Sequence, residues 1–131
     1  MWFEVGGARV FSQTGGRSID PLLPTVVMIH GAGMDQTIWQ QQSRYLAHHG
    51  WNVLAIDLPG HGRSSGIARS SVSASADWLI NFLDAAELET VALVGHSLGA
   101  LISLDAAGRH GDRVSRAALL GVTPKMPVHQ A

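Results

Sequence analysis

One serine lies in a pattern that suits nucleophilic chemistry: Ser97, within Gly95-His96-Ser97-Leu98-Gly99. An apolar run over 91–94 precedes the pattern and an Ala/Leu/Ile-rich segment follows it, which predicts a buried strand, a sharp turn and a helix. Ser97 is then expected at the apex of the turn. A serine hydroxyl needs an exposed position and a base that takes its proton. Gly95 and Gly99 are expected to be glycine because a Cβ at either position would crowd the turn.

A second segment with chemical potential, His30-Gly31-Ala32-Gly33, follows the β-branched run of residues 25–29. Its small residues let the backbone approach closely, so that an N–H group can point into a site. The N–H of Leu98, at a helix N-terminus, and one N–H from Ala32 or Gly33 would together hold an oxyanion formed at Ser97. The alternatives at this point are an ordinary strand-to-helix turn and a serine that only caps a helix.

A third segment, Asp57 to Ser64, follows a buried strand predicted over 51–56 and is rich in Gly and Pro, which predicts a loop. We expect Asp57 to accept backbone N–H bonds across this loop and so to have a structural role. A contact of Arg63 with substrate or with a cap domain is left open.

The remaining elements are predicted from periodicity and from turn residues. Two β-prone runs flank Gly6-Gly7, which predicts a hairpin. Helices are expected from Asp35 or Thr37 to about His49, around the apolar face of Trp78 to Ala86 after a flexible serine-rich stretch over 64–75, and from Leu98 to about His110. A last strand is expected within 114–122. About six strands and three helices in this order predict an α/β fold, with a mainly parallel sheet and helices on both faces.

All three chemical segments begin just past predicted strand C-termini, so they are expected at one edge of the sheet, where such folds bind ligands. Composition also limits the compartment and the partners that we expect. The 131 residues are 46% hydrophobic, carry a net charge of −1 and include no cysteine, which favours one cytoplasmic domain without nucleic-acid or membrane partners. No signal peptide is apparent. No histidine spacing suggests a metal, and no glycine-rich nucleotide loop is present, so we expect no metal or cofactor.

The three segments, in this order and spacing and with Trp39 between the first two, resemble those of the α/β-hydrolase superfamily. The resemblance covers nearly the whole chain and implies an esterase, lipase, haloperoxidase-like or C–C-bond hydrolase activity on a small ester or acyl substrate. It makes Ser97 the nucleophile and the N–H groups of Ala32 and Leu98 the oxyanion hole. Supporting residues of the loops and elbow are His30, Gly31, Gly33, Asp57, Gly95, His96 and Gly99. A serine at the elbow disfavours the family's dehalogenases and epoxide hydrolases, which use aspartate there.

The family's acid and histidine follow the nucleophile in the chain, and neither comes from the loop of Asp57 and His61. After Ser97, Asp105 lies within the predicted helix, Asp112 precedes the last strand, and His129 lies in a proline-broken tail. We therefore expect the chain to be the N-terminal half of a hydrolase that is truncated at its C-terminus and inactive alone. Its last strand is expected to be an apolar sheet edge that promotes self-association. The competing hypothesis is a non-catalytic α/β module that binds a ligand or partner.

Overall fold

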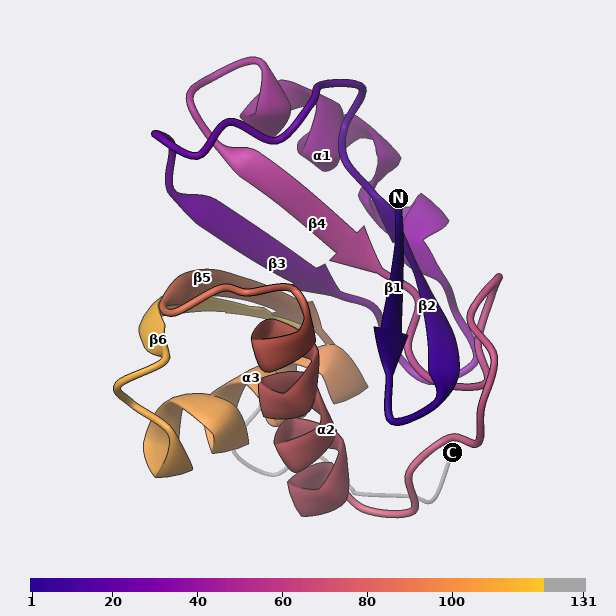
Figure 1. Cartoon of the computed structure of the whole chain (residues 1–131). Helices are drawn as coiled ribbons and strands as arrows, with labels where there is room; N and C mark the ends of the chain where they lie inside the picture. The colour runs from indigo at the N-terminus through magenta and orange to yellow at the C-terminus, as the bar shows by residue number, and fades with distance from the viewer. Residues whose placement is uncertain (122–131) are drawn as a thin grey trace.

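The computed structural model describes residues 1–121, which form one six-stranded sheet with helices on both faces (Figure 1). The strands are β1 (Trp2–Val5), β2 (Ala8–Gln13), β3 (Thr25–Ile29), β4 (Asn52–Ile56), β5 (Val91–His96) and β6 (Val114–Leu120). The helices are the 3₁₀ helix η1 (Gln36–Trp39), α1 (Gln40–Ala47), α2 (Val72–Ala85) and α3 (Leu98–Arg109).

The sheet order is β1-β2-β4-β3-β5-β6, in which β4, β3, β5 and β6 are parallel and the hairpin β1–β2 is antiparallel. The hairpin turns at Gly6 and Gly7, whose φ values of 58° and 83° are the left-handed pair that a two-residue turn requires. The predicted α/β class and the mainly parallel sheet are confirmed.

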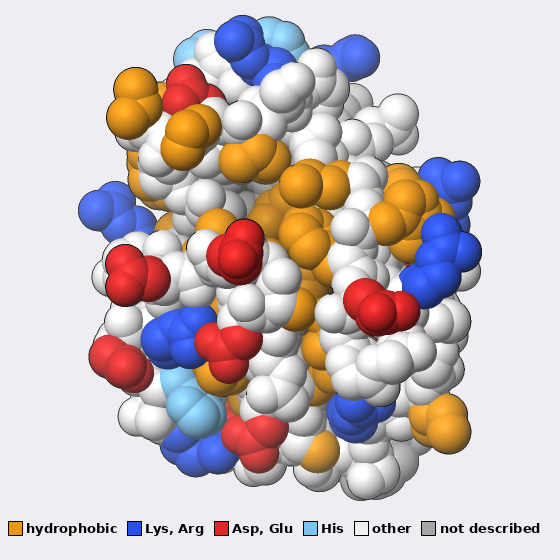
Figure 2. Space-filling view, viewed as in Figure 1, with side chains coloured by type: hydrophobic (Ala, Val, Ile, Leu, Met, Phe, Trp, Pro, Cys, Tyr) orange, Lys and Arg blue, Asp and Glu red, His pale blue; other side chains and the backbone are white. Residues whose placement is uncertain are grey.

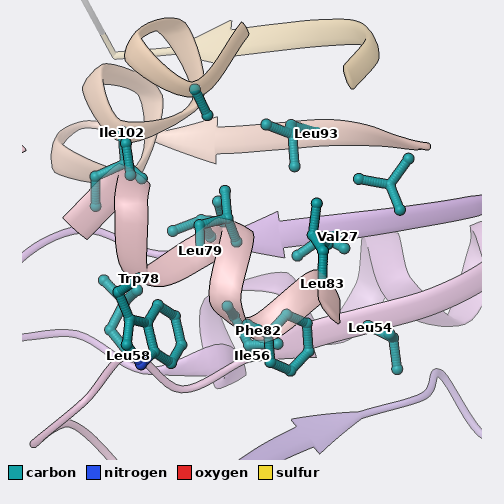
Figure 3. Close-up of a cluster of buried hydrophobic side chains, with 14 of the residues drawn as sticks. Val27, Leu54, Ile56, Leu58, Trp78, Leu79, Phe82, Leu83, Leu93 and Ile102 are labelled. Carbon is teal, nitrogen blue, oxygen red and sulfur yellow. The ribbon is translucent and has the colours of Figure 1, made fainter. Parts of the chain in front are cut away.

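Two apolar clusters lie on the two faces of the sheet. The larger packs α2 and α3 against the strands, and Figure 3 shows Leu79, Phe82 and Leu83 of α2 directed at Val27, Leu54 and Ile56. The smaller cluster places Trp39 of η1 and Ala47 of α1 against the opposite face. The apolar face predicted for α2 is therefore confirmed, and every residue of β3 and β4 is buried.

The helix ends differ in detail from the predicted ones. Asp35 caps the first helix by accepting the N–H of Thr37 at 2.9 Å, but the first turn is 3₁₀ and α1 already ends at Ala47. The serine-rich stretch over 64–75, predicted to be flexible and to offer several possible N-caps, is helical in its last part, since α2 begins at Val72. The cause is Ser71, whose hydroxyl accepts the N–H of Ala74 at 3.0 Å and starts the helix earlier.

Ion pairs join the outer surfaces of α2 and α3. Arg109 lies 3.0 Å from Asp77 and pairs with Asp105, while Arg113 lies 2.8 Å from Asp84. Figure 2 shows acidic, basic and histidine side chains interleaved in the lower left of this face, over these helices. Within residues 1–121, no helix is long and apolar enough to cross a bilayer.

β6 forms one edge of the sheet, and among residues 1–121 no strand pairs with its outer side. Its residues 115–120 are all exposed, including Leu119 at 38% and Leu120 at 47%. An exposed strand with apolar side chains and free backbone groups is a template for pairing with another strand.

We propose that two copies of the chain associate through this edge. Light scattering after size exclusion should then give a mass above that of the monomer, and Leu119→Lys should shift the distribution towards monomer. Leu22→Lys, at an 89% exposed loop position away from the edge, is the matched control and should leave the distribution unchanged. A monomeric wild-type chain would contradict the proposal.

Candidate functional site

Three loops meet beyond the C-terminal ends of β3, β4 and β5, as the sequence predicts. The loops after β3 and β5 touch, because a Cβ placed on Gly31 would lie 3.3 Å from the Cβ of Ser97. The loops after β3 and β4 are joined by a hydrogen bond of 3.0 Å from the N–H of Leu58 to Nε2 of His30. The residues predicted for the site are thus brought to one edge of the sheet.

Ser97 has a backbone conformation that L-residues rarely adopt, with φ 58° and ψ −115°. It is the N-cap residue of α3, yet its hydroxyl makes no capping hydrogen bond. Such a conformation costs on the order of 1–3 kcal/mol and persists only where the surroundings impose it. A serine that only capped the helix would have extended backbone angles and a bonded hydroxyl. The capping alternative therefore does not account for this residue.

Two glycines impose the turn at Ser97. A Cβ on Gly95 would lie 2.2 Å from the carbonyl oxygen of Gly99, and a Cβ on Gly99 would lie 2.1 Å from the carbonyl oxygen of Ile29. Neither neighbour is a flexible side chain, so neither can move aside cheaply. The crowding predicted at these positions is confirmed, and it brings the first turn of α3 directly against β3.

His30 is a fully buried link between the loops. Because Nε2 accepts the N–H of Leu58, the proton lies on Nδ1, which donates to the carbonyl of Gly31 at 2.7 Å. Burial, the largest cause, lowers the pKa of His30 below its ordinary value of 6.5. A neutral ring satisfies both bonds, whereas protonation would remove the acceptor of the Leu58 N–H.

Asp57 organises the third loop as predicted. Its carboxylate accepts the N–H of Gln36 at 2.8 Å and that of Arg63 at 2.9 Å, and it is buried. Its own carbonyl accepts the hydroxyl of Ser64 at 2.7 Å. The Arg63 side chain instead stacks over the ring of Phe11, with its guanidinium carbon 4.5 Å from the ring centre. This contact with the hairpin gives Arg63 a packing role, which sequence reasoning missed.

His96 lies next to Ser97 and has a buried Nδ1 without a hydrogen-bond partner among residues 1–121. A Cβ on Gly121 would lie 3.3 Å from its Nε2, so the ring packs against the end of β6. His48 and His49 instead bond to the carbonyl oxygens of Arg44 and Tyr45 at the end of α1. Among residues 1–121, no group of three acidic or histidine side chains could hold a metal ion.

A pocket opens between the three loops and α2. It is bordered by both proposed oxyanion donors, Ala32 and Leu98, and by Gly33. Its other lining residues are Leu58, Pro59, His61, Ala68, Arg69, Ser75 and Trp78. Trp78 and Leu58 lie together at one end of the core cluster (Figure 3). Arg69 was not anticipated, since no motif includes it; only its position just before the capped start of α2 could have indicated it.

The positions of Ala32 and Leu98 suit their N–H groups to donate hydrogen bonds to an anion. Leu98 is the first residue of α3, and the first-turn N–H groups of a helix have no acceptor within it. The helix dipole adds positive potential at the same end. Ala32 follows Gly31, whose contact with Ser97 brings this loop to the serine, and both Ala32 and Leu98 line the same pocket.

Comparison with known proteins gives consistent results. A protein-family model described as alpha/beta hydrolase fold matches residues 24–131 of the chain. The chain is 36% identical over 114 residues to (E)-2-((N-methylformamido)methylene)succinate hydrolase of Acinetobacter baylyi, covering 86% of this chain and 40% of that protein. It is 38% identical over 120 residues to pimeloyl-[acyl-carrier protein] methyl ester esterase of Methylococcus capsulatus, covering 88% and 42%.

Among solved structures, a membrane phospholipase A described as a bacterial virulence factor superposes with a TM-score of 0.84 at 32% identity. The match covers 97% of this chain and 41% of that one. The chain thus spans about 40% of the length of the curated relatives it matches.

Because α3 packs closely on β3, one added methyl group at Gly99 is expected to destabilise the fold strongly. Gly99→Ala should lower the free energy of unfolding by roughly 3 kcal/mol or more, because the Cβ meets backbone that cannot move without shifting the strand. Gly108→Ala is the control in the same helix, where a Cβ meets nothing within 4 Å. It should raise stability by roughly 0.5–1 kcal/mol. Urea unfolding measures both; equal effects would contradict the packing account.

The buried His30 predicts a pH dependence of stability. Its pKa is lower in the folded chain than the unfolded value of 6.5, so the unfolded chain binds the proton more readily. The stabilising contribution is complete above that unfolded value and is lost as pH falls towards the folded pKa, by at most ~1.4 kcal/mol per pH unit.

Urea unfolding between about pH 7.5 and about pH 5.5 should show this loss. His30→Gln is less stable at neutral pH because the Leu58 N–H bond is altered, but its slope should be smaller. His48→Gln, at an exposed position, should keep the wild-type slope. An unchanged slope in His30→Gln would contradict the assignment.

Proposed function

Because this chain belongs to the α/β-hydrolase fold family, we propose that it carries the nucleophile of a serine hydrolase acting on a carboxylic ester or similar acyl substrate. The observation that carries the proposal is the conformation of Ser97, whose φ is 58° and whose hydroxyl makes no capping hydrogen bond. The names of the relatives add support, since one is a hydrolase and another a methyl ester esterase.

In the proposed reaction, Oγ of Ser97 attacks the carbonyl carbon of the ester while a base takes the hydroxyl proton. The carbonyl oxygen becomes an oxyanion, which the N–H groups of Ala32 and Leu98 stabilise. Collapse of this intermediate breaks the bond to the alcohol, which leaves with the proton. Water then cleaves the acyl-serine ester, releasing the acid and restoring the hydroxyl.

No base for this step lies beyond the nucleophile within residues 98–121. His110 approaches Asp77 of α2, and Asp105 pairs with Arg109. Both lie towards the C-terminal end of α3. Because a helix rises 1.5 Å per residue, His110 stands on the order of 20 Å along the axis from Ser97. His129 lies outside the described residues. This separation also motivates the second candidate, a non-catalytic module that binds a ligand at the same edge.

A fluorophosphonate probe distinguishes the two candidates. With imidazole supplied as an external base, the probe should label Ser97, as peptide mass spectrometry can locate. Without imidazole, labelling should fall towards the level of Ser97→Ala, and p-nitrophenyl acetate should be hydrolysed no faster than by that variant. Ser70→Ala, at an exposed serine, is the control and should keep the label. A non-catalytic module gives no imidazole-dependent label at Ser97.

A further inference from the structure

Within residues 1–121, six of the ten residues that line the pocket near Ser97 are apolar. Leu58, Pro59, Ala68 and Trp78 line it together with Ala32 and Leu98, and Leu98 directly follows Ser97 in the chain. A pocket of this kind favours a hydrocarbon chain, because apolar surface leaves water on binding. Since the proposed oxyanion donors border the pocket, a chain that fills it starts at the carbonyl carbon to be attacked.

The charge lining the pocket has one sign. Among residues 1–121, Arg69 is the only lining residue with a permanent charge, and no aspartate or glutamate of this part of the chain borders the cavity. The ring of His61 also lines it, with Nδ1 3.0 Å from the carbonyl oxygen of Pro59. The one nearby buried carboxylate, Asp57, is already engaged by two backbone N–H groups. An anion in this pocket would therefore meet a cation and no competing acidic side chain.

Arg69 is available for such an anion. One guanidinium nitrogen donates to the carbonyl of Ile67 at 2.8 Å, which holds the side chain within its own loop. Among residues 1–121, no carboxylate lies within ion-pair distance of it, in contrast to Arg109 and Arg113. The planar guanidinium keeps further N–H donors, and it is suited to binding a carboxylate with two parallel hydrogen bonds.

The size of the pocket limits the ligand. The cavity measures ≈ 70 Å³, which favours a short acyl group over a long one. A carbonyl, two or three methylenes and a carboxylate form an acyl group of correspondingly small size.

From this arrangement we propose that the pocket selects acyl groups that end in a carboxylate, bound by Arg69. The substrate class is the half-esters of short dicarboxylic acids, with the ester carbonyl at Ser97 and the free carboxylate at the loop before α2. This assignment rests on the proposed function for the position of the reacting carbonyl. Arg69 is a specificity-determining residue in this scheme and takes no part in bond cleavage.

The test measures binding, so it needs no turnover. Amide NMR spectra of the chain are recorded during titration with monomethyl glutarate and, separately, with its uncharged counterpart dimethyl glutarate. The half-ester should shift the amide signals of Gly33, Ala68 and Leu98 and should bind more tightly than the diester. Arg69→Gln should weaken half-ester binding by about fivefold or more and leave diester binding unchanged. Arg69→Lys keeps the charge but loses the planar guanidinium, so its affinity for the half-ester should lie between those of the wild-type chain and Arg69→Gln.

Arg44→Gln is the matched control, because Arg44 is an exposed arginine of α1 on the opposite face of the sheet, and it should bind like wild type. Ser97→Ala should also keep half-ester binding, so a failure of the proposed nucleophile is distinguishable from a failure of this inference. Equal binding of the two ligands, equal loss in Arg69→Gln and Arg44→Gln, or no shifts at the pocket amides would each overturn it.

Discussion

The site depends on the contact between the first turn of α3 and the end of β3. Gly99 lies so close to the carbonyl of Ile29 that a Cβ there would be 2.1 Å away, and Gly95 is equally crowded by Gly99. The chain must therefore reverse within two residues, and Ser97 takes the strained conformation that the reversal requires. The same contact directs the N-terminus of α3 towards the loop after β3. Hydroxyl, helix N-terminus and loop are consequently positioned by one packing constraint.

Much of this arrangement could be predicted from the sequence, because it follows from local chemistry. Gly95 and Gly99 flank a serine between an apolar run and a helical segment, and only a sharp turn accommodates that order. Asp57 precedes a loop rich in Gly and Pro, where a carboxylate is the available acceptor for free N–H groups. The convergence of the loops follows from the alternation of strands and helices, since parallel strands place their C-terminal ends along one edge.

Other features could not be predicted, because they depend on neighbours distant in the chain. Arg63 belongs to a recognisable motif, but its stacking on Phe11 requires the position of the hairpin. The role of His30 as a neutral acceptor became clear only with the N–H of Leu58 beside it. Arg69 belongs to no pattern, and its place at the pocket follows from the packing of α2. Several serines of the stretch over 64–75 are equally suited to cap α2, so the sequence alone does not single out Ser71.

The central claim is that Ser97 presents its hydroxyl to a site where backbone N–H groups stabilise negative charge. The most direct measurement is a crystal structure of the chain after reaction, in the presence of imidazole, with a methylphosphonate, which imitates the tetrahedral intermediate. The account predicts phosphorus bonded to Oγ of Ser97, with one phosphoryl oxygen about 2.7–3.1 Å from the N–H groups of Ala32 and Leu98. A phosphonate on another residue, or one on Ser97 with its oxygens turned to solvent, would contradict it.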